Sequence, residues 1–574
     1  MSLWGALYVG ASGLRTSQNA LNTVAHNLSN ADTKGYTRQQ ILQSDRRYTT
    51  LSMSDSAISY QQVGLGTFYS RSKQVRDVFL DQSFRRESGR SMFYQVSTEV
   101  MDEVESQLGE LNGEAFESNI TDLWTAVQEL AKDPASAVTQ GLFVQRASEL
   151  MTRAQGIYDG LCSYQDRLNE QIVQQVRKVN SYGHQLLELN NTIRSIEAGG
   201  IETANDYRDT RNRLLDELAE LVDITVSEDV YGNVDVRVEG VDFVKSGLCF
   251  DIGLDLDENT GFYTAFWPQL ATYTENSNGV RDYNIEGARV FDLNREISTD
   301  KQTDIGGLKA MFLARGDHRA NYTDIENNYD GISQSVVMNI QAEFDQLIHF
   351  LASEINGVLE KAAGVQTGNL TLEDGTFLQN VKYAEVDEGG YMRDQEGKPL
   401  QLFSKKVTDG YEKVRGQDGK EYWVYKEEDP SATETLYTVS NLRINQELMQ
   451  KPSLLGLRKP DGSEDIETAE ALRDLFSQEK YVLNPNVRKR TSIVGYYSDL
   501  VSQVGNSGYV YHAIYEHQQS TVQFTEDARD QVMSVSSDDE LTTMIKLQNA
   551  YNASSRYITA VSDMLEHMIT SLFG

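Results

Sequence analysis

The sequence predicts a mostly α-helical, multidomain protein of the α+β class. Both chain ends are expected to build one elongated helical trunk, with β-rich domains inserted at its far end. Three observations support this prediction: both ends carry seven-residue repeats, long stretches between them have helical periodicity, and two internal regions have strand and turn patterns. At roughly 100–200 residues per domain, the 574 residues correspond to three or four domains.

The repeats at the two ends predict terminal coiled-coil helices. Apolar or small residues recur at alternating intervals of four and three, which is typical of a coiled coil and narrower than the stripe of a helix on a globular core. Spacing alone is equally compatible with two helices packed in separate cores, but matched repeats at both extremes favour pairing of the ends. The large seam residues, which we expect to form an assembly interface, are Leu3, Leu7, Leu14, Leu21, Val24 and Leu28 at the front and Met544, Leu547, Tyr551, Ile558, Val561, Leu565, Met568 and Leu572 at the back.

The two ends are also poor in charge. Residues 3–30 contain one charged residue, Arg15, and residues 541–574 contain four, whereas the chain average of 24% predicts about seven and about eight. The small uncharged side chains found instead allow a helix to be covered on every side at little desolvation cost. Within the repeats, Gly10, Ser17, Ala31 and Ser554 would let a partner helix come close.

The front helix is expected to be marginal without a partner. Its six large seam residues contribute about 12 kcal/mol if fully buried, whereas ordering the backbone of residues 3–30 costs roughly 28–56 kcal/mol. Helical hydrogen bonds offset only part of that cost. We therefore expect the termini to be mobile in the monomer and to become helical only when neighbouring subunits cover them.

Between the ends, helical and strand patterns alternate. At Ile224 the apolar period changes to two, with a turn at 231–233, which predicts a β-rich insertion up to about residue 304. A second region, about 364–439, is dense in Gly, Asp and aromatic residues, including a turn at 387–391, and predicts short hairpins. Helices are expected at 76–107, 115–132, 138–196, 204–222, 305–316, about 334–363 and from about 466 to the end, with a Gly-rich interruption at 505–508.

These patterns divide the chain into four expected domains. A terminal coiled-coil assembly domain consists of residues 1–48 and 535–574. A helical trunk consists of residues 49–222, 305–363 and 440–534. The two inserted β domains are residues 223–304 and residues 364–439.

Composition and motifs argue against several classes of function. The formal net charge of −34 argues against nucleic-acid binding, no apolar stretch approaches the roughly 18–20 residues of a membrane span, and no signal-peptide pattern is present. The seven histidines form no metal-ligand motif, and the acidic stretch 255–261 departs from a calcium loop. We expect Cys162 and Cys249 to be free thiols, and we expect no metal, no cofactor, no catalytic residues and no enzymatic activity.

Several segments resemble one known family. Residues 25–39 end in Gly35-Tyr36-Thr37-Arg38-Gln39, and similar segments follow in order at 64–85, 205–221, 306–315 and 497–505. Together with the terminal heptads they resemble the hook-associated proteins that form the hook–filament junction of the bacterial flagellum. The residues that carry the first motif are Asn27, Asn30, Gly35, Tyr36, Thr37 and Arg38.

The resemblance implies an extracellular structural subunit that acts as an adaptor between hook and filament. Such proteins leave through the flagellar type III export apparatus without a cleaved signal peptide, with an export chaperone as an expected partner. Their terminal helices form the innermost part of the axial tube as a homo-oligomer, with the hook subunit below and a second junction protein above. Neither nucleic acid nor membrane insertion is implied.

Three alternatives remain open on the sequence alone. A flagellar rod or hook subunit shares the first motif and the terminal heptads, although Thr37-Arg38-Gln39 and the mainly helical trunk argue against it. An exported wall-remodelling enzyme is a second alternative. A surface-binding adhesin that acts through residues 364–439 is a third.

Overall fold

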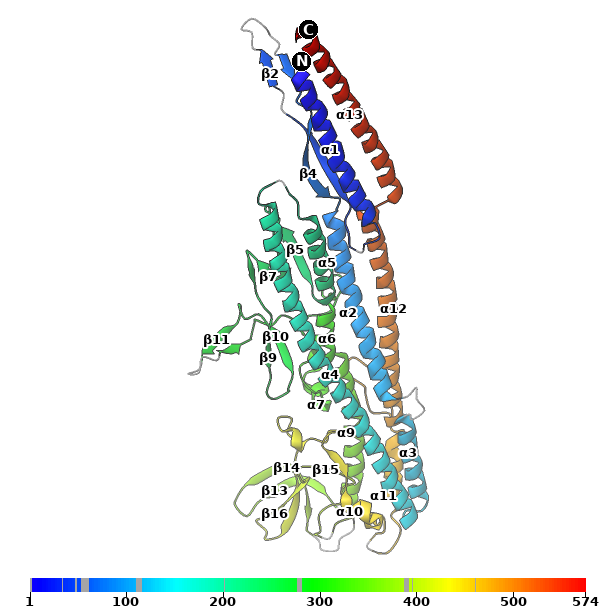
Figure 1. The fold of residues 1–574 in the computed structure, drawn as a ribbon. Helices are drawn as coiled ribbons and strands as arrows, with labels where there is room; N and C mark the ends of the chain where they lie inside the picture. The colour runs from blue at the N-terminus through cyan, green and yellow to red at the C-terminus, as the bar shows by residue number, and fades with distance from the viewer. Residues whose placement is uncertain are drawn as a thin grey trace.

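The computed structural model describes residues 3–573 except 34, 47–48, 53–60, 110–115, 201, 276–280, 387–391, 395 and 460. The molecule is elongated, with both termini at one end, a long helical trunk in the middle and a β-rich region at the opposite end (Figure 1). The fold class is confirmed: long helices dominate and several small sheets are inserted between them. None of the helices in the described ranges has the length and apolar character that a membrane crossing requires.

The terminal end of the molecule is a pair of helices with a hairpin beside it. Helix α1 (Leu3–Ser29) and helix α13 (Ser537–Phe573) lie side by side and run in opposite directions (Figure 1). Strands β1 (Gln39–Asp45) and β4 (Thr67–Gln74) pair antiparallel next to α1, and the short strands β2 (Thr49–Ser52) and β3 (Gln61–Val63) pair between them. The hairpin is fastened to α1 where the Thr67 backbone N–H donates to Ser12 Oγ at 3.2 Å.

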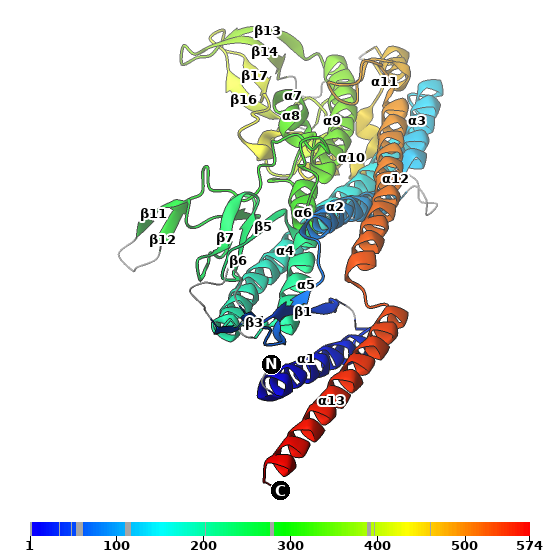
Figure 2. The same ribbon diagram turned by 90° about the horizontal axis from the view of Figure 1, so that it is seen from above.

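The trunk is built from segments of both halves of the chain. Helix α2 begins after Asp77, whose side chain accepts hydrogen bonds from the first free backbone N–H groups of the helix. Helix α12 packs along α2, although more than 380 residues separate their starts (Figures 1 and 2). The trunk helices are α2 (Val78–Leu108), α3 (Phe116–Lys132), α4 (Ala137–Glu197), α5 (Asn205–Leu221), α6 (Gly307–Arg315), α7 (Tyr322–Asn327), α8 (Tyr329–Ile332), α9 (Val336–Ala362), α11 (Ile466–Ser477) and α12 (Ile493–Met533).

One core joins most of these helices. The rings of Phe116, Phe344 and Tyr497, from α3, α9 and α12, meet with centroids 5.0–5.2 Å apart. The expected interruption at 505–508 is wrong: α12 continues through Gly505 and Gly508 without a break. Glycine costs a helix only about 1 kcal/mol relative to alanine, which the packing of α12 on α2 can offset.

The first insertion is a β domain that lies beside the trunk. Its main sheet has the order β5-β6-β7-β8, and Val234, Val236 and Val238 point their buried side chains into a core shared with α4 and α5. The expected position at the far end is therefore wrong for this domain, because its apolar face packs on the middle of the trunk (Figure 1). Its strands are β5 (Ile224–Glu228), β6 (Val234–Val238), β7 (Val241–Lys245), β8 (Leu248–Cys249), β9 (Gly253–Leu256), β10 (Tyr263–Phe266), β11 (Thr272–Glu275) and β12 (Arg281–Asn284).

The second insertion does lie at the far end of the trunk (Figure 1). Its sheet has the order β13-β14-β17-β16, from β13 (Gln366–Thr371), β14 (Phe377–Glu385), β16 (Tyr411–Arg415) and β17 (Glu421–Tyr425). The turn expected at 387–391 is outside the described residues.

The boundary expected at residue 439 falls inside this region. Strand β15 (Phe403–Lys405) pairs with β18 (Leu442–Ile444), and both contribute to the trunk core, so residues just after 439 form a strand that pairs with the second insertion. Apolar side chains on these short strands are buried against the helices, and this burial holds the insertion to the trunk. The remaining short elements are η2 (Thr433–Thr435), α10 (Gln446–Gln450) and η3 (Pro452–Leu455).

Candidate assembly interface

Helices α1 and α13 meet through small residues of α1. Ala6 packs against Val561 and Leu565, and a Cβ atom added at Gly10 would lie 2.7 Å from Ile558 Cγ1. One turn further, a Cβ at Gly13 would lie 2.9 Å from Ser554 Oγ. Positions further along α1 contact positions with lower residue numbers in α13, so the two helices are antiparallel.

The stripe of α1 that faces α13 also has heptad spacing, and it shares Gly10, Ser17 and Val24 with the predicted repeat but none of the leucines. Its members are buried or half-buried, and Val24 is the one large seam residue among the described front positions that is fully covered. Because residues three or four apart share a helix face, the leucines lie along one flank of this stripe. The stripe comprises Ala6, Gly10, Gly13, Ser17, Ala20 and Val24.

The predicted seam residues occupy three kinds of environment. Val24, Val561 and Leu565 are buried, and Met568 is exposed. The side chains of Leu3 and Leu572 are outside the described set. Half-buried positions are Leu7, Leu14, Leu21, Leu28, Met544, Leu547, Tyr551 and Ile558.

Both ends are helical in the single chain. This contradicts the expectation that they become helical only in an assembly, and the reason is that each helix has a partner within the same chain. Their mobility in the monomer stays a prediction. Among the residues that the structure describes, the apolar cluster between the two helices is small and consists of Ala6, Leu7, Val561 and Leu565.

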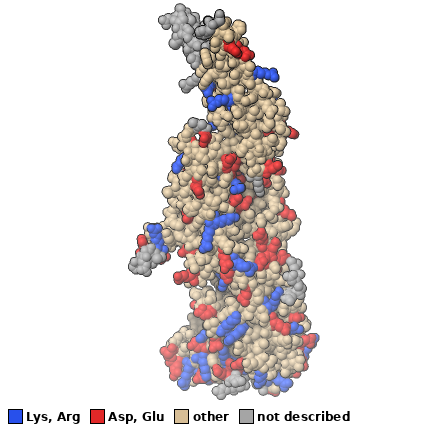
Figure 3. Space-filling view, viewed as in Figure 1, with Lys and Arg blue, Asp and Glu red and all other residues tan. Residues whose placement is uncertain are grey.

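Much apolar surface of this pair remains uncovered. Trp4 of α1 is 73% exposed, and Met564 and Ile569 of α13 are 60% and 52% exposed. Figure 3 shows few charged side chains over the terminal helices and many over the opposite end of the molecule. Exposed large apolar side chains on a surface with few charges are typical of a protein interaction site.

The first motif forms a joint between the terminal pair and the trunk, with Asn27 at its centre. Asn27 Oδ1 accepts from Tyr36 Oη at 2.8 Å and from the Gln39 backbone N–H at 3.0 Å. Its Nδ2 donates to the Gln39 carbonyl at 2.9 Å and to Glu540 Oε2 at 3.2 Å. The buried amide thus links the end of α1, the start of β1 and the start of α13.

Arg38 extends this joint to the end of α12. Its backbone N–H donates to the Met533 carbonyl at 2.9 Å, and its Nε donates to Glu540 Oε1 at 2.8 Å. Asn30 ends α1 with its Nδ2 on the His26 carbonyl, and Gly35 has φ of 81°, a conformation that favours glycine. These residues turn the chain from α1 into the strand.

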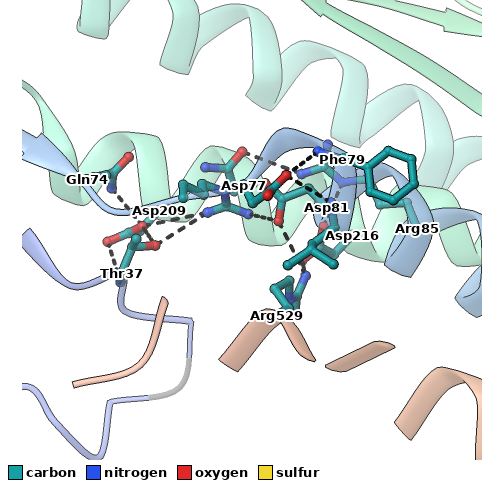
Figure 4. A network of polar contacts seen from close by, with 12 residues as sticks. Thr37, Gln74, Asp77, Phe79, Asp81, Arg85, Asp209, Asp216 and Arg529 are labelled. Atoms are coloured by element: carbon teal, nitrogen blue, oxygen red, sulfur yellow. Dashed lines mark hydrogen bonds and ion pairs between the residues drawn. The ribbon is translucent and has the colours of Figure 1, made fainter. Parts of the chain in front are cut away.

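Asp209 of α5 fastens the same strand to the trunk (Figure 4). Its Oδ1 accepts from Thr37 Oγ1 at 2.6 Å and from Gln74 Nε2 at 2.8 Å, and its Oδ2 accepts from the Thr37 backbone N–H at 3.2 Å. Burial raises the pKa of Asp209, while the hydrogen bonds from Thr37 lower it. The motif threonine therefore has a specific partner in α5.

Two arginines and Asp216 complete the joint on the trunk side (Figure 4). Asp216 of α5 accepts from Arg85 Nε of α2 at 2.7 Å and from Arg529 Nη1 of α12 at 2.8 Å. The Arg529 guanidinium lies 3.8 Å from the centroid of the Phe84 ring. Three helices from distant parts of the sequence are thus joined by one carboxylate.

Comparisons with known proteins find relatives over the whole chain. Residues 101–372 match the model of the flagellar hook-associated protein FlgK helical domain, and these residues form most of the trunk and first insertion. Flagellar hook-associated protein 1 of Bacillus subtilis is 22% identical over 100% of this chain and 99% of its own, and that of Salmonella typhimurium is 22% identical over 97% and 98%. The chain is similar to flagellar hook-associated protein 1 along its whole length.

The two ends match more general models. Residues 7–37 match the flagella basal body rod protein, and residues 532–571 match the flagellar basal body rod FlgEFG protein C-terminal region. These segments coincide with most of α1, the first motif and α13, so the terminal pair is the part of this chain that is similar to the rod-protein models. A solved structure of the flagellar hook junction protein FlgK from Burkholderia pseudomallei has a TM-score of 0.48 at 13% identity, over 80% of this chain and 100% of that one.

Sequence reasoning found the motif, the α13 seam, and Gly10, Ser17 and Val24 on the face of α1 that meets α13, but it missed Ala6, Gly13 and Ala20 on that face. The missed residues are small, so they carry little hydrophobic signal. Their spacing of four and three from Ala6 to Val24 was available and could have identified them.

Proposed function

We propose that this chain is the structural adaptor at the junction of flagellar hook and filament. It assembles as a homo-oligomer in the axial tube, with the hook subunit below and a second junction protein above. The observation that carries the assembly mode is the terminal helix pair, which has few charges and leaves Trp4, Met564 and Ile569 largely uncovered. Sister copies that cover these side chains would gain about 1.5–3 kcal/mol for each one fully buried.

The polar joint couples the terminal helices to the trunk. Asn27 and Arg38 link both terminal helices through Glu540, and Asp209 links the intervening strand to α5. A load on the terminal pair therefore passes through directional hydrogen bonds into the trunk, and we propose that this coupling keeps successive subunits in one orientation. The first insertion faces outward beside the trunk.

The same proposal covers export and partners. The chain leaves the cell through the flagellar type III apparatus without a cleaved signal, accompanied by a chaperone that shields the exposed apolar face of the terminal pair. Its role is structural and not enzymatic, which its similarity to flagellar hook-associated protein 1 supports.

Deletion of the gene tests the function. Cells that lack the protein should still make hooks but should release their flagellin into the medium, and the intact gene should restore filaments. If the deletion abolishes the hook itself, the chain acts as a rod or hook subunit. Restored filaments with lost surface adhesion, from a gene without residues 364–439, would support the adhesin alternative.

Single substitutions test the assembly surface. Met564→Asp should block filament attachment while α1 and α13 stay paired, because Met564 is 60% exposed beside the contact. Leu565→Asp should block attachment and also loosen the pair, because Leu565 is buried against Ala6. The matched control is Val230→Asp in the first insertion, where the side chain is 93% exposed and attachment should persist. Normal attachment with Met564→Asp would refute the assembly mode.

A further inference from the structure

Three potential metal ligands meet where the first insertion touches the trunk. His184 lies on α4, Cys249 ends β8 and Asp251 follows two residues later. His184 Nε2 is 3.0 Å from Asp251 Oδ1, and Cys249 Sγ is 3.8 Å from the same oxygen. The ligand atoms all lie within 4.8 Å of one another.

Two of these separations are close to the edges of a tetrahedral zinc site. With Zn–N of about 2.0–2.1 Å, Zn–O of about 2.0–2.2 Å and Zn–S of about 2.3 Å, the tetrahedral angle places N and O about 3.4 Å apart and S and O about 3.6 Å apart. The observed N–O separation is shorter, at 3.0 Å, and the observed S–O separation is longer, at 3.8 Å. Because His184 and Asp251 are 58% and 53% exposed, their side chains can make the small adjustment that an ion requires, and water can occupy a fourth position.

The backbone around the cluster is held independently of any ion. Asn180, one turn before His184, donates from Nδ2 to the Ile252 carbonyl at 3.0 Å and accepts from the Ile252 N–H at 2.9 Å. Gly183 allows the close approach of β8, since a Cβ there would lie 2.7 Å from Cys249 Sγ and 2.5 Å from Phe243 Cζ. The loop that carries Cys249 and Asp251 is thereby fixed against the helix that carries His184.

We propose that His184, Cys249 and Asp251 bind a divalent transition-metal ion such as Zn²⁺. Imidazole, thiolate and carboxylate together suit this class of ion better than Ca²⁺ or Mg²⁺, which prefer all-oxygen ligands. The bound ion bridges α4 and the β8–β9 loop, and it therefore braces the first insertion against the trunk. The site is independent of the proposed role in assembly.

Cobalt titration tests the proposal on the full-length protein in the presence of a non-thiol reductant. One equivalent of Co²⁺ should produce a thiolate-to-cobalt charge-transfer band, and Zn²⁺ should displace it. Cys249→Ala should abolish the band, and His184→Ala should weaken binding about tenfold or more, since loss of even outer-shell partners costs 10–100-fold. Zn²⁺ should also slow hydrogen exchange in the β8–β9 loop.

Cys162 provides the matched control. It is also a half-buried free thiol, but its sulfur accepts from Gln341 Nε2 at 3.6 Å in the trunk core. Cys162→Ala should leave the cobalt band unchanged. No band in the intact protein, or a band that survives Cys249→Ala, would overturn the proposal. A band that is insensitive to His184→Ala would also overturn it, because the thiolate would then bind without the helix.

Discussion

The close contact between α1 and α13 predicts that Gly10→Ala weakens the terminal pair. The new Cβ would lie 2.7 Å from Ile558 Cγ1, closer than carbon atoms normally approach, and 3.0 Å from Tyr557 Cδ1, which is an unusually tight contact. Ile558 is β-branched and has little freedom to move aside. The helices must therefore separate by a few tenths of an ångström or adopt strained side-chain conformations.

The magnitude follows from two opposing effects. Replacing glycine with alanine inside a helix stabilises it by about 0.5–1 kcal/mol, while overpacking costs about 1–3 kcal/mol. The net effect is a destabilisation of about 1 kcal/mol, or roughly a fivefold increase in opening of the pair. Gly141→Ala in α4 is the matched control, because a Cβ there has no heavy atom within 4 Å and only the favourable effect remains.

Hydrogen exchange measured by mass spectrometry separates the two outcomes. Peptides from α1 should exchange faster in Gly10→Ala, and peptides from α4 should exchange at the same rate or more slowly in Gly141→Ala. Trunk peptides should be unchanged in Gly10→Ala, since the terminal pair has its own small apolar cluster. Slower exchange of α1 in Gly10→Ala would refute the close antiparallel contact.

Three further substitutions test the joint and the trunk. Glu540→Gln removes the buried carboxylate that accepts hydrogen bonds from Asn27 and Arg38. Amide hydrogens in the first turns of α13 should then exchange about fivefold or more faster. Asp539→Asn, at an exposed neighbouring position, should change the exchange little. Asp216→Asn leaves Arg85 and Arg529 without their shared carboxylate and should lower the free energy of unfolding by about 3 kcal/mol. An unchanged midpoint of thermal unfolding would show that this carboxylate does not join the three helices. Burial raises the pKa of Glu343 from 4.5 to about 7, so its folded form binds a proton more tightly and this stabilisation is lost as pH rises through 7. The free energy of unfolding, measured from pH 4.5 to 7, should therefore decrease less with pH in Glu343→Gln than in the unaltered protein, by at most about 3 kcal/mol. An unchanged pH dependence would contradict the raised pKa of Glu343.

The trunk could be predicted well because its helices carry strong apolar periodicity. The expected helix at 138–196 is α4 (Ala137–Glu197), and that at 204–222 is α5 (Asn205–Leu221). The interruption at 505–508 was wrong because local glycine content has less influence than packing along a partner helix. The position of the first insertion was wrong because periodicity identifies a buried face without identifying what covers it.

The joint could be predicted only in part. The motif from Asn27 to Arg38 was found by resemblance, but its partners were not, because Thr37 and Asp209 are separated by 172 residues. Asp216 and Arg529 are separated by 313 residues. Polar partners at such separations leave no periodic trace in one sequence, and with 86 acidic residues any pairing would have been arbitrary.

The two kinds of contact at the terminal end suit two different tasks. Small residues such as Gly10 make a contact between α1 and α13 that is close but low in apolar area, so the pair can adjust when sister copies arrive. The joint instead uses a buried amide and carboxylates with fixed donors, which tolerate little change in geometry. The adaptor that we propose needs this combination, because helices that pack against sister copies must fit those neighbours while their direction relative to the trunk stays constant.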